Sequence, residues 1–92
     1  MTKVTIGEDY IEISGHSPKK IVCHGLSAIS QMTANYLEKC KLADVAMCDD
    51  AYLKIFNIVQ NEISIFFLEA FVDAIKDIEN SYPGNIEIEF VC

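Results

Sequence analysis

The chain opens with two short stretches in which apolar and polar residues alternate. Val4 and Ile6 lie between polar neighbours, and Ile11 and Ile13 repeat this spacing after a Gly-Glu-Asp turn. A period of two is typical of strands that bury one face, and a turn between two such runs indicates a β-hairpin. The pattern therefore predicts a hairpin that ends at Gly15.

An amphipathic helix pattern follows the hairpin, because apolar residues recur there in steps of three and four. Its positions are Val22, Leu26, Ile29, Thr33, Tyr36 with Leu37, and Cys40. Two starts fit the sequence. Ser17-Pro18 is similar to a cap followed by proline in the first turn. A start at Val22, which we prefer, leaves the amide groups near Cys23 free to hold a thiolate or an oxyanion.

The second half of the chain repeats the order of a hairpin and a helix. Val45 and Met47, then Leu53 and Ile55, flank Asp49-Asp50 and indicate a second hairpin. A longer helical pattern starts at about residue 59 and stops at residues 82–85, and an alternating strand follows over residues 86–90. The predicted fold is one α+β domain over residues 1–92, with ββαββαβ order and two helices packed on a mainly antiparallel sheet.

The apolar stripe of the second helix is about twice as wide as a helix facing solvent needs. Its members are Val59, Ile63, Phe66, Phe67, Ala70, Phe71, Ala74, Ile75, Ile78 and Tyr82. A helix of this kind is either central or covers both the sheet and a partner subunit. We therefore expect a homodimer, with Phe66, Phe67, Phe71 and Ile75 at the interface.

Composition narrows the classes of function. Of 92 residues, 14 are acidic and 7 basic, for a formal charge of −7, which argues against direct binding of nucleic acid. We see no signal peptide and no apolar run of the ~20 residues that a membrane span needs. The four cysteines lack metal-ligand spacing. We expect a cytoplasmic protein with reduced thiols, no metal and no membrane contact, in which Cys40 and Cys48 are small core residues and Cys92 has no role.

His16 and Cys23 lie on the connection between the first hairpin and the first helix. A thiol acts as a nucleophile through its thiolate, which a nearby imidazole or a helix N-terminus favours. One histidine and one cysteine seven residues apart are weak evidence by spacing alone. Seven residues can span ~23 Å, so a bend would let the two side chains meet. His24 is next to Cys23 but would face another side of the helix, and we assign it no role.

The wider motif is more specific. Gly15-His16, then Ile21-Val22-Cys23, then Ser27-Ala28-Ile29 resembles the signature of the ribosomal-processing cysteine proteases, the Prp family. The resemblance implies a cysteine endopeptidase that removes an N-terminal extension from a large-subunit ribosomal protein, or that acts on a phage or other protein. It implies His16 as base, Cys23 as nucleophile, Ser27 and Gly15 as support for substrate or oxyanion, a homodimer, and no cofactor.

Three features depart from the family pattern. The loop between His16 and Cys23 is several residues shorter and lacks the family's glycines, and Lys20 stands where the family has aspartate. Ser17 replaces an alanine, and His24-Gly25 replaces a pair of alanines. The alternative interpretation is an inactive homodimeric module that binds a peptide in the same groove without cutting it.

Overall fold

The computed structural model describes residues 1–48 and 51–91. Its elements are β1 (Thr2–Ile6), β2 (Ile11–Ser14), α1 (Lys20–Lys39), β3 (Asp44–Cys48), β4 (Tyr52–Phe56), α2 (Glu62–Ser81) and β5 (Ile86–Phe90). The predicted ββαββαβ order is confirmed. The predicted turn at Asp49-Asp50, the side chain of Cys48 and Cys92 lie outside the described part.

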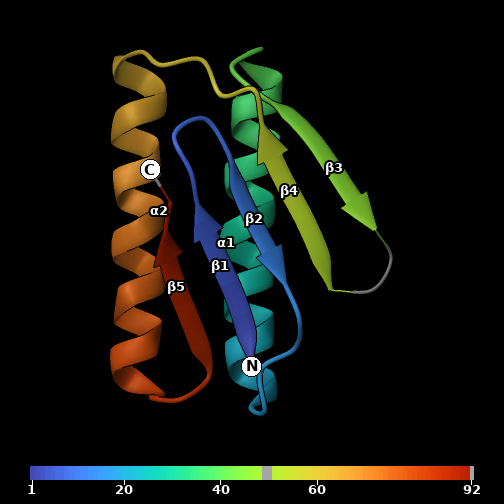
Figure 1. Ribbon diagram of the computed structural model, residues 1–92, viewed down its shortest axis with the longest axis vertical. Helices are drawn as coiled ribbons and strands as arrows, with labels where there is room; N and C mark the ends of the chain where they lie inside the picture. The colour runs from blue at the N-terminus through green and yellow to red at the C-terminus, as the bar shows by residue number, and fades with distance from the viewer. Residues whose placement is uncertain (49–50, 92) are drawn as a thin grey trace.

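The five strands form one sheet in the order β3-β4-β2-β1-β5. β1 pairs parallel with β5, and the other neighbours are antiparallel, so the sheet is mainly antiparallel as predicted. Figure 1 shows both helices behind one face of this sheet, running in opposite directions. None of the helices in the described part combines the length and the apolar character that crossing a membrane requires.

The core lies between the helices and one face of the sheet. Val4, Ile11 and Ile55 from the strands and Leu37 and Ile75 from the helices are at most 1% exposed. Alternate strand residues point to the other face, which carries a 3.1 Å ion pair between Lys3 and Glu89. β1, β2 and β4 therefore bury one side, as their alternating patterns predict, whereas Met47 of the edge strand β3 is exposed.

Both helix starts differ from the predictions. α1 begins at Lys20, two residues before the preferred start at Val22, and its N-cap Lys19 makes no side-chain cap bond. α2 begins at Glu62 because Asn61 and Ser64 form a reciprocal capping box. The start at residue 59 was predicted from the spacing of apolar residues. The hydrogen bonds of the cap place the first residue of α2 at Glu62 instead.

Two expectations about side-chain burial are wrong. Cys40, expected in the core, is exposed at the C-terminal end of α1. Phe71 and Ile75, expected at a dimer interface, are 2% and 0% exposed and belong to the core. The apolar stripe of α2 is wide because its two sides have different surroundings, one against the sheet and one in solvent.

The solvent side of the two helices carries exposed apolar residues. Met32 and Tyr36 of α1 and Ile63 and Phe66 of α2 are between 39% and 66% exposed. Tyr36 stacks on Phe67 with ring centroids 4.6 Å apart, which joins the outer surfaces of the two helices. We call Met32, Tyr36, Ile63 and Phe66 the outer helix patch.

Candidate active site

The chain leaves β2 at Gly15, a position that favours glycine for its backbone angle and for lack of space. Gly15 has φ +90°, and a Cβ at this position would lie 2.8 Å from the carbonyl oxygen of Met1. Its N–H donates to the carbonyl of Ala51 at 3.0 Å. Gly15 therefore turns the chain out of the sheet, and its own amide is already engaged and does not point at a substrate.

A buried polar cluster fixes the loop after this turn. The Ser17 hydroxyl lies 2.7 Å from the Thr2 hydroxyl and 2.9 Å from the carbonyl oxygen of Asn85, to which it donates. The side-chain oxygen of Asn85 accepts the Lys19 N–H at 3.2 Å. Thr2, Ser17 and Asn85 are at most 8% exposed. Residues from β1 and from the turn before β5 thus hold the loop against the sheet.

Cys23 is the fourth residue of α1 and is half-buried. The backbone N–H of Ser17 donates to its sulfur at 3.1 Å, and the thiol donates to the Ser17 carbonyl at 3.3 Å. An N–H donor favours the negatively charged form of the atom that accepts from it. The loop therefore supplies both a donor and an acceptor to this sulfur, and the donor is the group that can assist developing negative charge.

The amide groups at the start of α1 are used differently from the prediction. The N–H groups of Val22 and Cys23 both donate to the carbonyl of Lys19, at 3.1 and 3.2 Å. The amide of Cys23, which we expected to be available, is therefore occupied in this arrangement. The amide directed at the sulfur comes from Ser17 instead.

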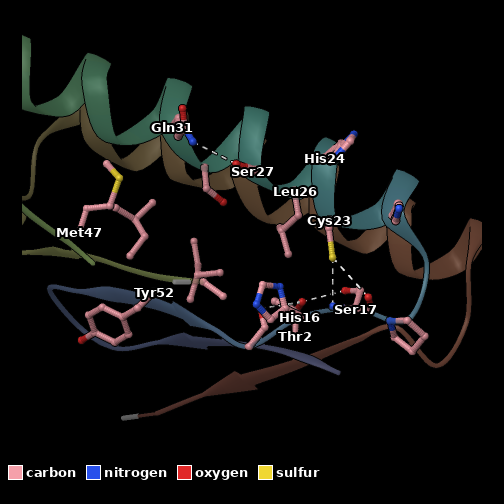
Figure 2. A pocket seen from close by; sticks show the side chains of 17 residues that line it. Thr2, His16, Ser17, Cys23, His24, Leu26, Ser27, Gln31, Met47 and Tyr52 are labelled. Carbon is pink, nitrogen blue, oxygen red and sulfur yellow. Dashed lines mark hydrogen bonds between the residues drawn. The ribbon is translucent and has the colours of Figure 1, made fainter. Parts of the chain in front are cut away.

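One groove collects the predicted site residues. A cavity of about 770 Å³ is lined by Gly15, His16, Cys23 and Ser27, among others. In Figure 2 the sulfur of Cys23 points from α1 toward the loop, and the imidazole of His16 lies on the sheet side of the same space. The ring of His24 points away from the sulfur, over the other side of the helix. The proposed catalytic roles remain predictions.

Ser27 is exposed at the rim of this groove, where its hydroxyl accepts from the side-chain amide of Gln31 at 3.0 Å. Lys20, which replaces the family's aspartate, is exposed and also lines the groove. Among residues 1–48 and 51–91, no group of three or more His, Cys, Asp or Glu side chains is placed to hold a metal ion.

The groove continues along α1 toward β3 and β4, where its walls are mostly apolar. Leu26, Met47 and Leu53 contribute to this arm, and Figure 2 shows Met47 at the end away from Cys23. Ser30 also lines it, is 3% exposed, and has a hydroxyl with no hydrogen-bond partner in the part of the chain that the structure describes. A buried hydroxyl of this kind is uncommon.

Sequence reasoning missed the residues that shape the groove around His16 and Cys23. Thr2, Ser17 and Asn85 are far apart in the chain, and their spacing gives no sign that they meet. The replacement of the family's alanine by Ser17 was the one available signal. Ser30 was missed because the predicted face passed from Ile29 to Thr33, whereas Ser30 and Thr33 are the residues that the helix buries there.

Comparison with known proteins supports one family. The model of the family described as cysteine protease Prp matches residues 1–87. No protein with a curated description matches the chain.

Solved structures match the fold closely at low sequence identity. An essential ribosomal processing protease Prp from S. aureus, in complex with a covalently linked product peptide, has a TM-score of 0.86 and 22% identity, covering 99% of this chain and 100% of that one. The S. aureus protease with a substrate peptide has a TM-score of 0.79 and 19% identity, covering 98% and 97%. A protein from Streptococcus mutans has a TM-score of 0.74 and 22% identity, covering 98% and 91%.

Proposed function

Because the chain belongs to the cysteine protease Prp family, we propose that it is a cysteine endopeptidase with Cys23 as nucleophile and His16 as base. One observation carries this proposal: the sulfur of Cys23 and the side chain of His16 line the same groove, and an N–H is directed at the sulfur. The half-buried Cys23 is accessible enough to react.

The chemistry needs only groups that line this groove. The imidazole of His16 takes the proton of the Cys23 thiol, and the thiolate adds to a peptide carbonyl carbon. The C–S bond forms while the carbonyl π electrons move to oxygen. The C–N bond then breaks, the leaving nitrogen takes the proton from His16, and a thioester remains. Water, deprotonated by His16, hydrolyses the thioester and returns the thiol.

The shape and charge of the chain favour a polypeptide substrate. A groove of about 770 Å³ can hold several residues of an extended segment, and its arm along α1 offers apolar walls to side chains. A charge of −7 attracts basic polypeptides. We propose as substrate the N-terminal extension of a large-subunit ribosomal protein, in line with the processing protease named for the S. aureus structures. We propose a cytoplasmic location, where thiols stay reduced.

We also propose that the chain forms a homodimer through the outer helix patch. Four large apolar side chains on adjacent helices are exposed, and a second copy would cover them with an identical surface. The patch replaces the interface predicted from the sequence, since Phe71 and Ile75 face the core.

The alternative function is a module that binds a peptide without cleaving it. Two observations favour it. The short loop is held at both Ser17 and Lys19 by Asn85, and Lys20 brings a positive charge to the groove where the family has an acid.

The deciding experiment is incubation with a large-subunit ribosomal protein that carries its N-terminal extension, followed by mass spectrometry. We expect a single cut near the extension, which Cys23→Ala and His16→Ala abolish and His24→Ala leaves intact. Binding of the extension by the wild-type chain without any cut would support the module instead. If the chain neither binds nor cleaves this protein, the proposed substrate is rejected.

A further inference from the structure

We propose that the backbone N–H of Ser17 is a further catalytic group, and that Thr2 and Asn85 are positioning residues that hold it through the Ser17 side chain. In the free protein this N–H donates to the Cys23 sulfur, and during attack it stabilises the oxyanion. The inference rests on the proposed function in one respect, the role of Cys23 as nucleophile.

The direction of the Ser17 amide is the first argument. It donates to the sulfur at 3.1 Å. When the sulfur bonds to a carbonyl carbon, the developing oxyanion is separated from the sulfur by that one carbon atom. A donor aimed at the sulfur is therefore within reach of the oxyanion, which is where a fixed N–H contributes most to catalysis.

The engagement of the neighbouring amides is the second argument. The N–H groups of Val22 and Cys23 are bonded to the carbonyl of Lys19, and that of Gly15 is bonded to the carbonyl of Ala51. An oxyanion at Cys23 could use these groups only if the helix start or the turn rearranged. Ser17 needs no such rearrangement.

The third argument is how firmly the Ser17 side chain is held. The hydroxyls of Thr2 and Ser17 lie 2.7 Å from each other. The Ser17 hydroxyl also lies 2.9 Å from the carbonyl oxygen of Asn85, and the Thr2 hydroxyl lies 3.4 Å from the carbonyl oxygen of Gly15. The two hydroxyl protons can therefore serve only two of these three contacts. The short contacts are both satisfied when Thr2 donates to Ser17 and Ser17 donates to Asn85. The Asn85 side chain is fixed in turn by donating to the carbonyl of Tyr82 at 2.9 Å.

These hydrogen bonds between β1, the loop and the turn before β5 agree with the way in which the sequence departs from the family pattern. The loop is short and lacks the family's glycines, and the hydroxyl of Ser17 stands where the family pattern has alanine. We infer that the Ser17 hydroxyl fixes the backbone of this short loop.

A test can use substitutions that leave all charges in place. The titratable groups that line the groove with Cys23 are His16, Lys20, His24 and Tyr52. Thr2→Val keeps the shape of a buried side chain but removes its hydroxyl, and Thr2→Ser keeps the hydroxyl. Thr33→Val is the matched control, since Thr33 is also fully buried and its hydroxyl donates to the carbonyl of Ile29, farther along α1.

The measurement is the rate of Cys23 alkylation by iodoacetamide from pH 5 to 9, resolved by peptide mass spectrometry. In Thr2→Val we expect Cys23 to react roughly 3- to 10-fold more slowly at neutral pH, because the Ser17 N–H that donates to its sulfur is displaced and one hydrogen bond is weakened. Thr2→Ser and Thr33→Val should follow the wild type. For peptide cleavage, kcat should fall at least about 10-fold in Thr2→Val with little change in KM, since loss of an oxyanion donor costs about 10²–10³ and here the donor is only displaced.

The outcomes separate this inference from the proposed function. Suppose that Thr2→Val has the wild-type circular dichroism spectrum and the wild-type rates of Cys23 alkylation. This result would overturn the positioning role of Thr2 and Asn85 and leave the proposed roles of His16 and Cys23 unaffected. A wild-type Cys23 that reacts only as an ordinary exposed thiol would reject the proposed nucleophile itself. If Thr2→Val does not fold, Ser17→Ala gives the same test, because it keeps the amide and loses both hydroxyl contacts.

Discussion

Replacing Ser30 by alanine should make the protein more stable. The Ser30 hydroxyl is buried without a partner among the described residues, in a side chain that is 3% exposed. Leaving a buried polar group unpaired costs about 1–3 kcal/mol. Alanine also has a higher helix propensity than serine, worth at most about 0.7 kcal/mol. The two contributions have the same sign, so we expect the free energy of unfolding to rise by about 1–4 kcal/mol.

Ser27→Ala separates the two contributions. Ser27 lies on the same helix but is exposed, and its hydroxyl accepts only from the exposed Gln31 side chain at 3.0 Å. This variant gains the helix propensity without removing a buried group, and we expect a change within about 0.5 kcal/mol. The difference between the two variants therefore measures the cost of the Ser30 hydroxyl.

Urea unfolding measures the change in the free energy of unfolding for both variants, Ser30→Ala and Ser27→Ala. The midpoint should move upward in Ser30→Ala with an unchanged slope, because the same surface is exposed on unfolding. For a domain of this size, 1 kcal/mol corresponds to roughly 4–8 °C in Tm. A Ser30→Ala protein that is less stable than Ser27→Ala would show that the hydroxyl has a partner in solution, and the reasoning would be refuted.

Three further predictions concern the site and the association of the chain. Iodoacetamide at neutral pH should modify Cys23 faster than Cys40, although Cys40 is exposed, because Cys23 shares its groove with the His16 imidazole and accepts the Ser17 N–H; faster labelling of Cys40, read by mass spectrometry, would count against the site. His16→Ala should slow both peptide cleavage and Cys23 alkylation, with cleavage reduced about 10²–10⁴-fold, whereas His24→Ala should match the wild type in both assays. Sedimentation at micromolar concentration should give a dimer that Phe66→Glu weakens without unfolding, since Phe66 is 66% exposed in the single chain; a wild-type monomer would rule out the interface.

The sequence alone determined the order of the elements. Strands that bury one face need apolar residues at every second position, and amphipathic helices need them every three or four residues, so the pattern around Val4 and Ile13 and along residues 22–37 specified the elements directly. The motif around His16 and Cys23 likewise identified the candidate dyad, and both residues line one groove.

Periodicity could not show what each face of a helix meets. Phe66 and Phe71 belong to the same apolar stripe, yet the first is exposed and the second is in the core. Cys40 continues the spacing of the buried face of α1 but is the exposed C-cap of that helix. Such outcomes depend on the positions of neighbouring elements, which a local pattern does not contain.

The surroundings of Cys23 were decided by the tertiary structure alone. Thr2, Ser17 and Asn85 meet because β1 pairs in parallel with β5, which brings the start of the chain beside the turn that follows α2. The amide that faces the sulfur is fixed by these contacts across 68 positions of sequence. Hydrogen bonds act over about 3 Å of space whatever the separation along the chain, so only the folded arrangement could bring these groups to Cys23.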